Sequence, residues 1–342
     1  MLTVSLVIPV LNAERTLVPC LNALGQLNPP PLEILLVDNG STDGTLPLAK
    51  QFQARVANCL ILHEPKRGAS AARNAGIHAA RGDIVAFTDA DCAPRPDWLE
   101  HVLQAFAEPS IGAVAGKIVG ATSTSLLELF SALYTLQSSD VPAIHERWTP
   151  WAGGFPTANL SVRRLLLEQL GGFDEDVAIY GEDYDLCARL YGAGSRIAFT
   201  PHPSVVHHHR STLTELLRQA FGFGRSHAYL MQRHHVPGVW LELPRRAVRW
   251  RTIAVSMWID CASPDKKLAT LLTAGLLYRS LLALAPLYAA WLIWETRKRA
   301  ISRGAHPPFT HSARLALLLL LKSCSMTLGR WWGSCRYGTV CI

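Results

Sequence analysis

The feature that most constrains this chain is a short apolar run that ends in two carboxylates, GDIVAFTDAD at residues 82–91. Ile84 to Thr88 has the length and the β-branched and aromatic composition of a buried strand. In an open α/β sheet, the residues that follow such a strand lie at the edge where ligands bind. Asp89 and Asp91 share one face of an extended segment and suit a hard cation such as Mg²⁺ or Mn²⁺. The simpler alternative is that both acids cap the helix predicted from Pro96 to Phe106.

Strands and helices are predicted to alternate along the first 200 residues. Helical patterns separate most of the apolar runs of strand length, which are found at residues 3–10, 33–37, 56–62, 84–88, 111–119 and 197–200. This alternation favours right-handed βαβ units around a mostly parallel sheet flanked by helices, an α/β fold of the Rossmann-like type. The second strand is followed by Asp38, which adds an acid at the ligand-binding edge.

Two common nucleotide-binding motifs are absent from the sequence. Residues 11–14, LNAE, follow the first strand in place of the G-x-G-x-x-G turn, which argues against a dinucleotide oxidoreductase. No G-x-x-x-x-G-K-[ST] occurs, which argues against a P-loop NTPase. The N-terminal segment also lacks the basic residues and cleavage site of a signal peptide, and we interpret it as the first strand.

Further chemically active residues occur between positions 150 and 210. Glu182 and Asp183 begin a predicted helix whose dipole favours the carboxylate form, although acids at this position are also common helix caps. Three consecutive His residues at 207–209 are either a solvated turn or ligands for an ion such as Mn²⁺. Residues 151–164 alternate Gly with aromatic residues, which fits a sugar pocket or a Gly-rich turn.

Charge is distributed unevenly along the chain, which has a formal net charge of +7. Residues 201–342 contain 19 Lys and Arg against 5 Asp and Glu, whereas residues 1–200 contain 14 against 21. The acidic part is typical of an enzyme core. The basic part suits a membrane surface better than nucleic acid, because the interleaved residues are mainly Leu and Ala. The 8 cysteines include no C-x-x-C pair, which indicates reduced thiols in a cytosolic compartment.

An apolar stretch of 27 residues runs from Leu268 to Trp294, interrupted by Arg279 and Pro286. Its length would span a bilayer, but basic residues flank both ends and Arg279 lies near the middle. We therefore predict helices that lie in or dip into the cytoplasmic leaflet, with Arg314 to Trp332 as a second amphipathic anchor. A transmembrane segment and a soluble helical cap are the alternatives.

Taken together, these segments resemble the inverting family-two glycosyltransferases of the GT-A fold. The segments that match, in the family's order and spacing, are residues 4–9 with Asn12, 37–45, Gly68 with 72–76, 87–91, 159–164, 171–175, 181–186, and His207 with His209. The likeness extends over residues 3–225. We therefore predict a catalytic domain over residues 1–225 and a basic, apolar, helical, membrane-associated region over residues 226–342.

The resemblance implies a nucleotide pocket. Asp38 is similar to the acid that hydrogen-bonds a uracil ring, Arg73 to a basic residue near the base and phosphates, and Asp89 to an acid that faces the ribose or the metal. The other residues that the resemblance assigns to this pocket are Pro9, Asn12 and Glu14. Leu11 departs from the family, in which many members have an aromatic residue that stacks on the base, and this departure leaves the nucleobase open.

The resemblance also implies a catalytic centre. Asp183 matches the family's catalytic base and Glu182 its neighbour, while Asp89, Asp91 and His207 match residues that bind a divalent metal, Mg²⁺ or Mn²⁺. This assignment agrees with the chemistry. Inversion at an anomeric carbon needs a base for the acceptor hydroxyl and an electrophile for the departing nucleoside diphosphate.

The predicted enzyme transfers a sugar from a nucleotide-sugar donor, with UDP as the expected nucleotide, to a glycan or lipid-linked acceptor at the cytoplasmic face of the cell membrane. The Q-x-x-R-W signature of processive relatives is not present as such, which favours the addition of one or a few sugars. The alternatives are a nucleotidyltransferase, a retaining GT-A enzyme, and a catalytically inactive GT-A scaffold.

Overall fold

The computed structural model of the protein describes residues 2–121, 125–135, 139–149, 154–176, 180–208, 212–243, 246–251 and 256–342. These residues form two compact units. The first unit contains the described residues up to 121 and from 139 to 208, and the second contains residues 125–135 and those from 212 onward. The boundary predicted at residue 225 lies inside helix α8 (Leu213–Arg233) of the second unit. The division into a catalytic domain and a membrane-associated region stays a prediction.

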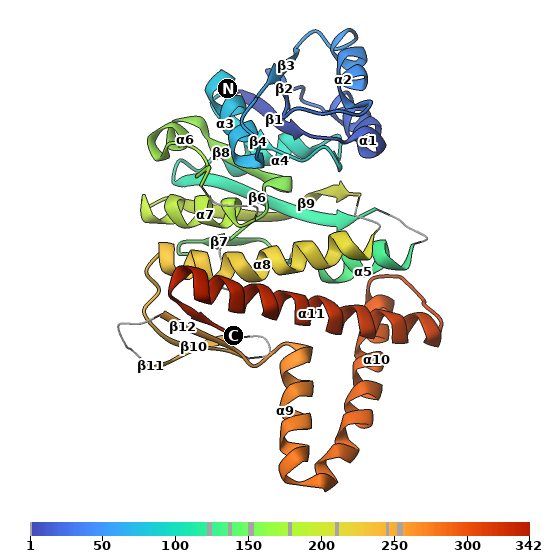
Figure 1. Ribbon diagram of the computed structural model, residues 1–342. Helices are drawn as coiled ribbons and strands as arrows, with labels where there is room; N and C mark the ends of the chain where they lie inside the picture. The colour runs from blue at the N-terminus through green and yellow to red at the C-terminus, as the bar shows by residue number, and fades with distance from the viewer. Residues whose placement is uncertain are drawn as a thin grey trace. The chain divides into compact units, whose positions relative to one another are not determined.

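The first unit is built on one large sheet with the strand order β3-β2-β1-β4-β8-β6-β9-β5, in which β7 also pairs with β9 (Figure 1). Parallel pairing joins β1 (Val4–Val10), β2 (Glu33–Asp38), β3 (Cys59–His63) and β4 (Ile84–Phe87), and also joins β6 (Ile111–Gly120) to β9 (Arg196–His207). The antiparallel members are β5 (Cys92–Pro94), β7 (Ala143–His145) and β8 (Leu160–Arg163). The prediction of an α/β fold with a mostly parallel central sheet is confirmed.

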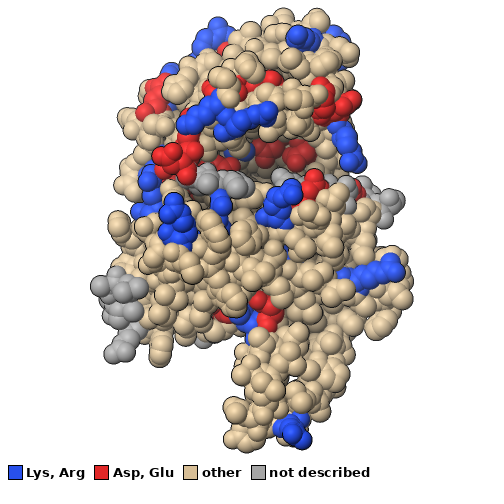
Figure 2. Space-filling model, viewed as in Figure 1, with Lys and Arg blue, Asp and Glu red and all other residues tan. Residues whose placement is uncertain are grey.

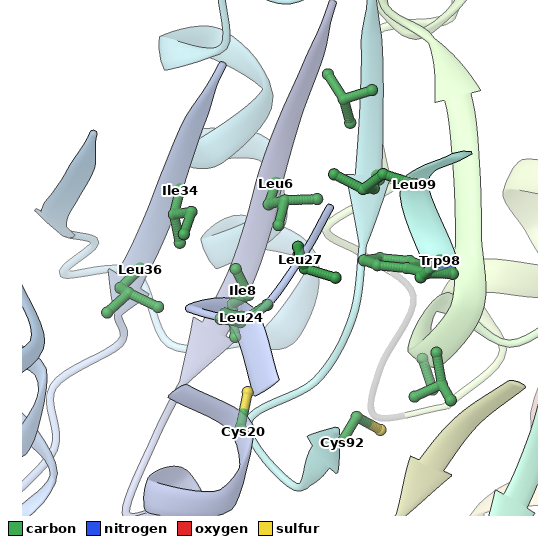
Figure 3. Close-up of a cluster of buried hydrophobic side chains, with 14 of the residues drawn as sticks. Leu6, Ile8, Cys20, Leu24, Leu27, Ile34, Leu36, Cys92, Trp98 and Leu99 are labelled. Atoms are coloured by element: carbon green, nitrogen blue, oxygen red, sulfur yellow. The ribbon is translucent and has the colours of Figure 1, made fainter. Parts of the chain in front are cut away.

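Helices flank this sheet, and both of its faces are buried. The helices of the unit are α1 (Glu14–Leu24), α2 (Thr45–Gln53), α3 (Ala69–Ala79), α4 (Trp98–Ala105), α6 (Arg164–Leu170) and α7 (Glu182–Gly192), with a short 3₁₀ turn, η1 (Thr157–Asn159). Within β1, Leu6 and Ile8 belong to one core cluster and Val7 to the other. Figure 3 shows the first cluster, to which Leu6 of β1 and Trp98 and Leu99 of α4 belong. Burial on both faces explains why these strands read as continuous apolar runs.

The last strand of the large sheet differs from the sequence prediction. A short strand was expected at residues 197–200, and the chain beyond it contains Pro201 and Pro203, which lack a backbone donor. In the structure, β9 continues to His207. Its pairing with β6 shifts register between Gly116 and Ile118, and this irregularity accommodates the two prolines. The extension places His207 at the end of a strand.

The second unit contains a helical pair and a small sheet. In Figure 1, α8 and α11 (Phe309–Tyr337) lie side by side. They approach closely at Gly224 and Gly329, where a Cβ atom would lie 2.0 Å from a backbone oxygen of the opposite helix. A sheet of order β11-β10-β12-β13 was not predicted, and it comprises β10 (Gly238–Leu243), β11 (Arg246–Arg251), β12 (Ser256–Asp260) and β13 (Val340–Cys341). The helical reading of residues 226–342 is therefore incomplete.

The apolar stretch from Leu268 to Trp294 is not one continuous helix. It is divided among α9 (Pro264–Leu277), the 3₁₀ turn η2 (Arg279–Ala283) and α10 (Leu284–Ser302). One helix in the described part of the chain, α11, is long and apolar enough by length and composition to cross a bilayer, and 33% of its apolar window is buried. The remaining helix of this unit is α5 (Leu126–Tyr134), whose Phe130 packs with Leu315 of α11.

Candidate active site

The predicted site residues gather where the parallel strands of the first unit end. β1, β2 and β4 end at Val10, Asp38 and Phe87, so the residues that follow each strand lie at one edge of the sheet. Parallel pairing sets this alignment, since Val10 lies opposite Asp38 and Val7 opposite Phe87. Figure 2 shows acidic side chains inside a hollow on the viewed face, with basic side chains beside them.

Asp38 ends β2 as a buried carboxylate with several donors. Its oxygens accept hydrogen bonds from the backbone N–H groups of Gly40 and Ser41 at 3.3 and 3.0 Å, and His63 Nδ1 lies 3.3 Å away. Burial raises the pKa of Asp38, but these hydrogen bonds outweigh it and hold the pKa below its usual value. Asp38 is therefore an ionised acceptor at neutral pH.

The loop after β1 is bonded to the loop after β2. Asn12, which has a positive φ of 48°, accepts from the Thr42 N–H through its Oδ1 at 2.8 Å, and Glu14 Oε2 accepts from the Gly44 N–H at 3.1 Å. Pro9 lies in β1 opposite Val37. Asn12 and Glu14 thus hold the backbone of the loop that follows Asp38, and Pro9 lies one residue before the strand position opposite Asp38. Their contact with a nucleotide stays a prediction.

Arg73 of α3 joins the two acidic motifs. Its guanidinium lies 2.9 Å from Asp89 Oδ1 and 2.9 Å from Glu182 Oε1, and its side chain is 5% exposed. Burial alone would lower the pKa of Arg73, but the neighbouring carboxylates raise it above its usual value. A permanent positive charge therefore lies between the acids that follow β4 and those that begin α7. From the sequence, Arg73 was expected near the base and phosphates. Its ion pairs with both Asp89 and Glu182 were not predicted.

Asp183 is the second residue of α7. The helix follows Gly181, whose φ of 100° allows the sharp turn before it. The helix start is as predicted. The dipole was expected to favour the carboxylate form of Asp183, and burial acts in the opposite direction. Burial raises the pKa of Asp183 to about 7, with a further contribution from the charge on Glu182, although Arg73 opposes the shift. The carboxyl group therefore ionises at a higher pH than an ordinary carboxyl group.

Asn74 positions the segment that precedes these acids, a role that the sequence analysis did not identify. Its side chain accepts from the Phe173 N–H at 2.8 Å and donates to the Phe173 carbonyl at 2.9 Å and to Glu175 Oε1 at 2.8 Å. Gly172, with a φ of 70°, leaves room for it, since a Cβ there would lie 2.4 Å from Asn74 Oδ1. The available signal was the position of Asn74 directly after Arg73.

Asp91 and His207 form a candidate metal site. Cys92 pairs with His207 across β5 and β9, and this pairing brings His207 Nε2 to 3.5 Å from Asp91 Oδ1. The donor set, a carboxylate oxygen and an imidazole nitrogen, fits a Mn²⁺-type ion. The Cys92 thiol lies in the same cluster, and burial raises its pKa well above the usual value. Asp89 is two residues away and is bonded to Arg73. His209 and Trp151 lie outside the described residues.

The comparisons with known proteins decide the family. The family model "Glycosyl transferase family 2" matches residues 5–168, which include Asp38, Arg73, Asp89 and Asp91. The chain is 30% identical over 264 residues to glycosyltransferase AglE of Haloferax volcanii, and the match covers 75% of this chain and 79% of that protein. The chain is a family-two glycosyltransferase.

Two further matches extend this result. The glycosyltransferase is 33% identical over 237 residues to the pre-mycofactocin glycosyltransferase of Mycobacterium tuberculosis, and that match covers 68% of this chain and 48% of the relative. The chain therefore corresponds to about half the length of that relative. The structure of the mannosyltransferase PcManGT from Pyrobaculum calidifontis, in complex with GDP-Man and Mn²⁺, superposes with a TM-score of 0.56 at 21% identity, covering 97% of this chain and 87% of that one. The predicted GT-A fold is confirmed.

Proposed function

We propose that this glycosyltransferase transfers a sugar from a UDP-sugar to a hydroxyl group of a glycan or lipid-linked acceptor, with inversion at the anomeric carbon and with a divalent cation. The observation that carries the proposal is the buried Arg73, which bonds both Asp89 and Glu182. It brings the acids at the sheet edge and the acids at the start of α7 into one site. A single-displacement reaction needs both groups together.

Asp183 is the proposed base. As the acceptor oxygen forms a bond to the anomeric carbon, its proton moves to the Asp183 carboxylate, and the bond from that carbon to the diphosphate oxygen breaks. The electron pair of the broken bond leaves with the nucleoside diphosphate. The raised pKa of Asp183 suits this role, because a carboxylate with a pKa of about 7 takes a proton more readily than an ordinary one. Arg73 lies next to Glu182 and favours the charged form of Asp183.

Asp91 and His207, with Asp89 beside them, are the residues that would hold Mg²⁺ or Mn²⁺, which neutralises negative charge on a diphosphate. Support comes from the donor set and from the PcManGT structure, whose ligands are GDP-Man and Mn²⁺. The nucleotidyltransferase alternative loses its basis because the family is that of glycosyltransferases. A screen of nucleotide sugars for metal-dependent slow hydrolysis tests the donor class, and the anomeric configuration of the product, measured by NMR, separates inversion from retention.

UDP is expected to bind this enzyme more tightly than GDP in the presence of Mn²⁺. The physical reason is that the ionised Asp38 can accept a hydrogen bond from the uracil N3–H group, while the loops after β1 and β2 surround the ring. Calorimetry with both nucleotides measures the difference. Asp38→Asn should reduce the preference for UDP, because an amide offers a weaker acceptor. Tighter binding of GDP by the unaltered enzyme would reject the uridine assignment.

The rate of transfer at saturating donor is expected to rise with pH up to about 7 and then level off. Asp183 accepts a proton only when it is ionised, and burial raises its pKa to about 7, so the protonated form that dominates at lower pH is inactive. A pH–rate profile measures this rise in the transfer rate. UDP binding without added metal over the same range is the control and should stay level, since the pKa of Asp38 is lowered. A rise in rate centred at about pH 4, the pKa of an ordinary carboxyl group, would contradict the role of burial.

The basic second unit supports a location at the cytoplasmic face of the cell membrane. A lipid-linked acceptor carries its hydroxyl group at that surface, and a positively charged protein is attracted to anionic headgroups there. The excess of Lys and Arg after residue 200 provides the charge. We therefore include the membrane surface among the partners of the proposed enzyme.

A further inference from the structure

The second unit contains a helical hairpin formed by α9, η2 and α10. Figure 1 shows α9 and α10 lying next to each other, connected at one end by η2. Tyr278 ends the first arm and Leu284 begins the second. The two arms also contact each other. Gly275 allows a close approach at the turn, because a Cβ at this position would lie 2.3 Å from the Leu282 side chain.

The outer surface of this hairpin is apolar. Near the turn, Leu276 is 82% exposed, Leu277 78% and Tyr278 68%, and on α10 Leu287 is 65% exposed. The sequence between Asp265 and Glu295 contains no acidic residue. Figure 2 shows the same projection as almost entirely uncharged, with one basic group at its end. Such a continuous apolar surface in water is unusual for a soluble enzyme and indicates a partner that covers it.

Basic and aromatic side chains surround the base of the hairpin. Lys267 Nζ lies 5.9 Å from the centre of the Trp291 ring, and Lys298 Nζ lies 5.0 Å from that of Trp294. Tryptophan beside lysine is typical of the boundary between lipid headgroups and acyl chains. The positive charge complements anionic headgroups and does not suit an apolar protein groove. The composition of the base therefore favours a lipid surface as the partner.

The reach of the hairpin corresponds to one leaflet. At about 1.5 Å per residue, the helical segment from Lys267 to Leu277 extends about 15 Å. The hydrocarbon core of a bilayer is about 30 Å thick, so this segment is about half as long as a spanning helix must be. Arg279 at the turn opposes deeper insertion, because a charged side chain at the centre of a bilayer is unfavourable. The hairpin is thus suited to entering a membrane without crossing it.

The other apolar helix of this unit, α11, is covered in part, with 33% of its apolar window buried. α11 packs against α8 at Gly224 and Gly329, and Leu315 of α11 lies in a core cluster with Phe130. Packing between these helices accounts for the buried part of the apolar window of α11. The hairpin has no comparable cover among the described residues of its own unit.

We propose that the α9–α10 hairpin inserts into one leaflet of an anionic phospholipid bilayer and holds the enzyme at the membrane surface without spanning it. Leu276, Leu277 and Tyr278 enter the acyl region. Trp291, Trp294, Lys267 and Lys298 lie at the headgroups. This inference rests on the surface of the second unit and does not depend on the donor, the metal or the base of the transfer reaction.

The first test is co-flotation of the full chain with vesicles of equal parts phosphatidylglycerol and phosphatidylcholine. Leu276→Gln with Leu277→Gln should reduce vesicle binding at least about tenfold, because it removes the most exposed apolar side chains from the leaflet. Leu165→Gln is the matched control, since Leu165 is 64% exposed on α6 of the first unit, and it should bind as the unaltered protein does. Arg279→Leu should strengthen binding to pure phosphatidylcholine vesicles, because it removes the charge that opposes insertion.

The second test measures the depth of insertion. Ser280→Cys is made in a chain whose exposed cysteines, Cys261, Cys324 and Cys335, are replaced by Ser. A membrane-impermeant maleimide should label it in solution and should fail to label it on vesicles, whether the reagent is outside or enclosed. Labelling by the enclosed maleimide would show that the turn reaches the vesicle lumen, and it would overturn insertion into a single leaflet. Labelling by maleimide added outside would show that the turn stays in water, and it would overturn insertion.

Two further results would overturn the proposal. One is unchanged flotation of the Leu276→Gln, Leu277→Gln variant. The other is a dimer in solution that this variant dissociates while vesicle binding stays the same, which would identify a second copy as the partner. Donor hydrolysis by this variant in detergent solution reports separately on the proposed transfer reaction, so failure of one proposal is distinguishable from failure of the other.

Discussion

Asp183→Asn is expected to lower the rate of sugar transfer by roughly 10²- to 10⁴-fold, the range typical for loss of a general base, while UDP binding stays within a few-fold of that of the unaltered enzyme. Asparagine keeps the size of the side chain, and its Oδ1 can still accept from the Tyr184 N–H group, which lies 2.9 Å from Asp183 Oδ1 in the structure. The change removes the group that takes the acceptor proton. Initial rates at saturating donor, with calorimetry of UDP binding, measure both effects.

Asp176→Asn is a suitable control for this experiment. Asp176 is an exposed acid in the turn after Phe173, and its amide variant should transfer sugar at a near-normal rate. A structural role for Asp183 predicts the reverse pattern, a loss of stability with little loss of rate in the folded fraction. If Asp183→Asn retained near-normal transfer to a genuine acceptor, the base would have been misassigned, and Glu182, Asp174 and Asp185 would be the next residues to change.

Asp91→Ala is expected to abolish turnover and to weaken the part of UDP binding that depends on Mn²⁺. Asp91 Oδ1 lies 3.5 Å from His207 Nε2, and removal of the carboxylate leaves one of the two donors at the candidate metal site. Calorimetry of UDP with and without Mn²⁺ separates metal-dependent binding from the rest. A mere helix-capping role would cost about 0.5–2 kcal/mol of stability and leave activity measurable.

The control for the metal experiment is Asp97→Ala. Asp97 immediately precedes α4, and its carboxylate lies 3.9 Å from Arg95 at the surface. This variant loses an acid from the same part of the chain and should keep its dependence on Mn²⁺. Unchanged metal dependence in Asp91→Ala itself would reject Asp91 as a ligand.

Much of the first unit could be predicted from sequence for a definite physical reason. Strands buried on both faces must be continuously apolar, so a polar residue such as Asp38 or Asp89 marks the point at which the chain leaves the sheet. Parallel pairing then brings those points to one edge. The pattern therefore indicated both the fold class and the place of the acids before any contact was known.

Other features depend on contacts that a local pattern does not contain. His207 lies beside Asp91 because β9 continues past two prolines and pairs with β5. Arg73 meets a partner 109 residues away at Glu182. The raised pKa of Asp183 depends on burial, which a local sequence pattern does not show. In the second unit, Arg279 and Tyr278 lie at a break between helices that an apolar stretch of 27 residues does not reveal.

The ion pairs of Arg73 affect how mutational data on this enzyme should be read. Each carboxylate partner compensates a charge that is almost completely removed from water, so deletion of Asp89 or Glu182 leaves the guanidinium with half of its counter-charge. The loss of activity after either change then includes the rearrangement of Arg73. Such losses do not add, and neither one equals the catalytic contribution of a single residue. A double-mutant cycle over Arg73, Asp89 and Glu182 treats the three as the unit that they form.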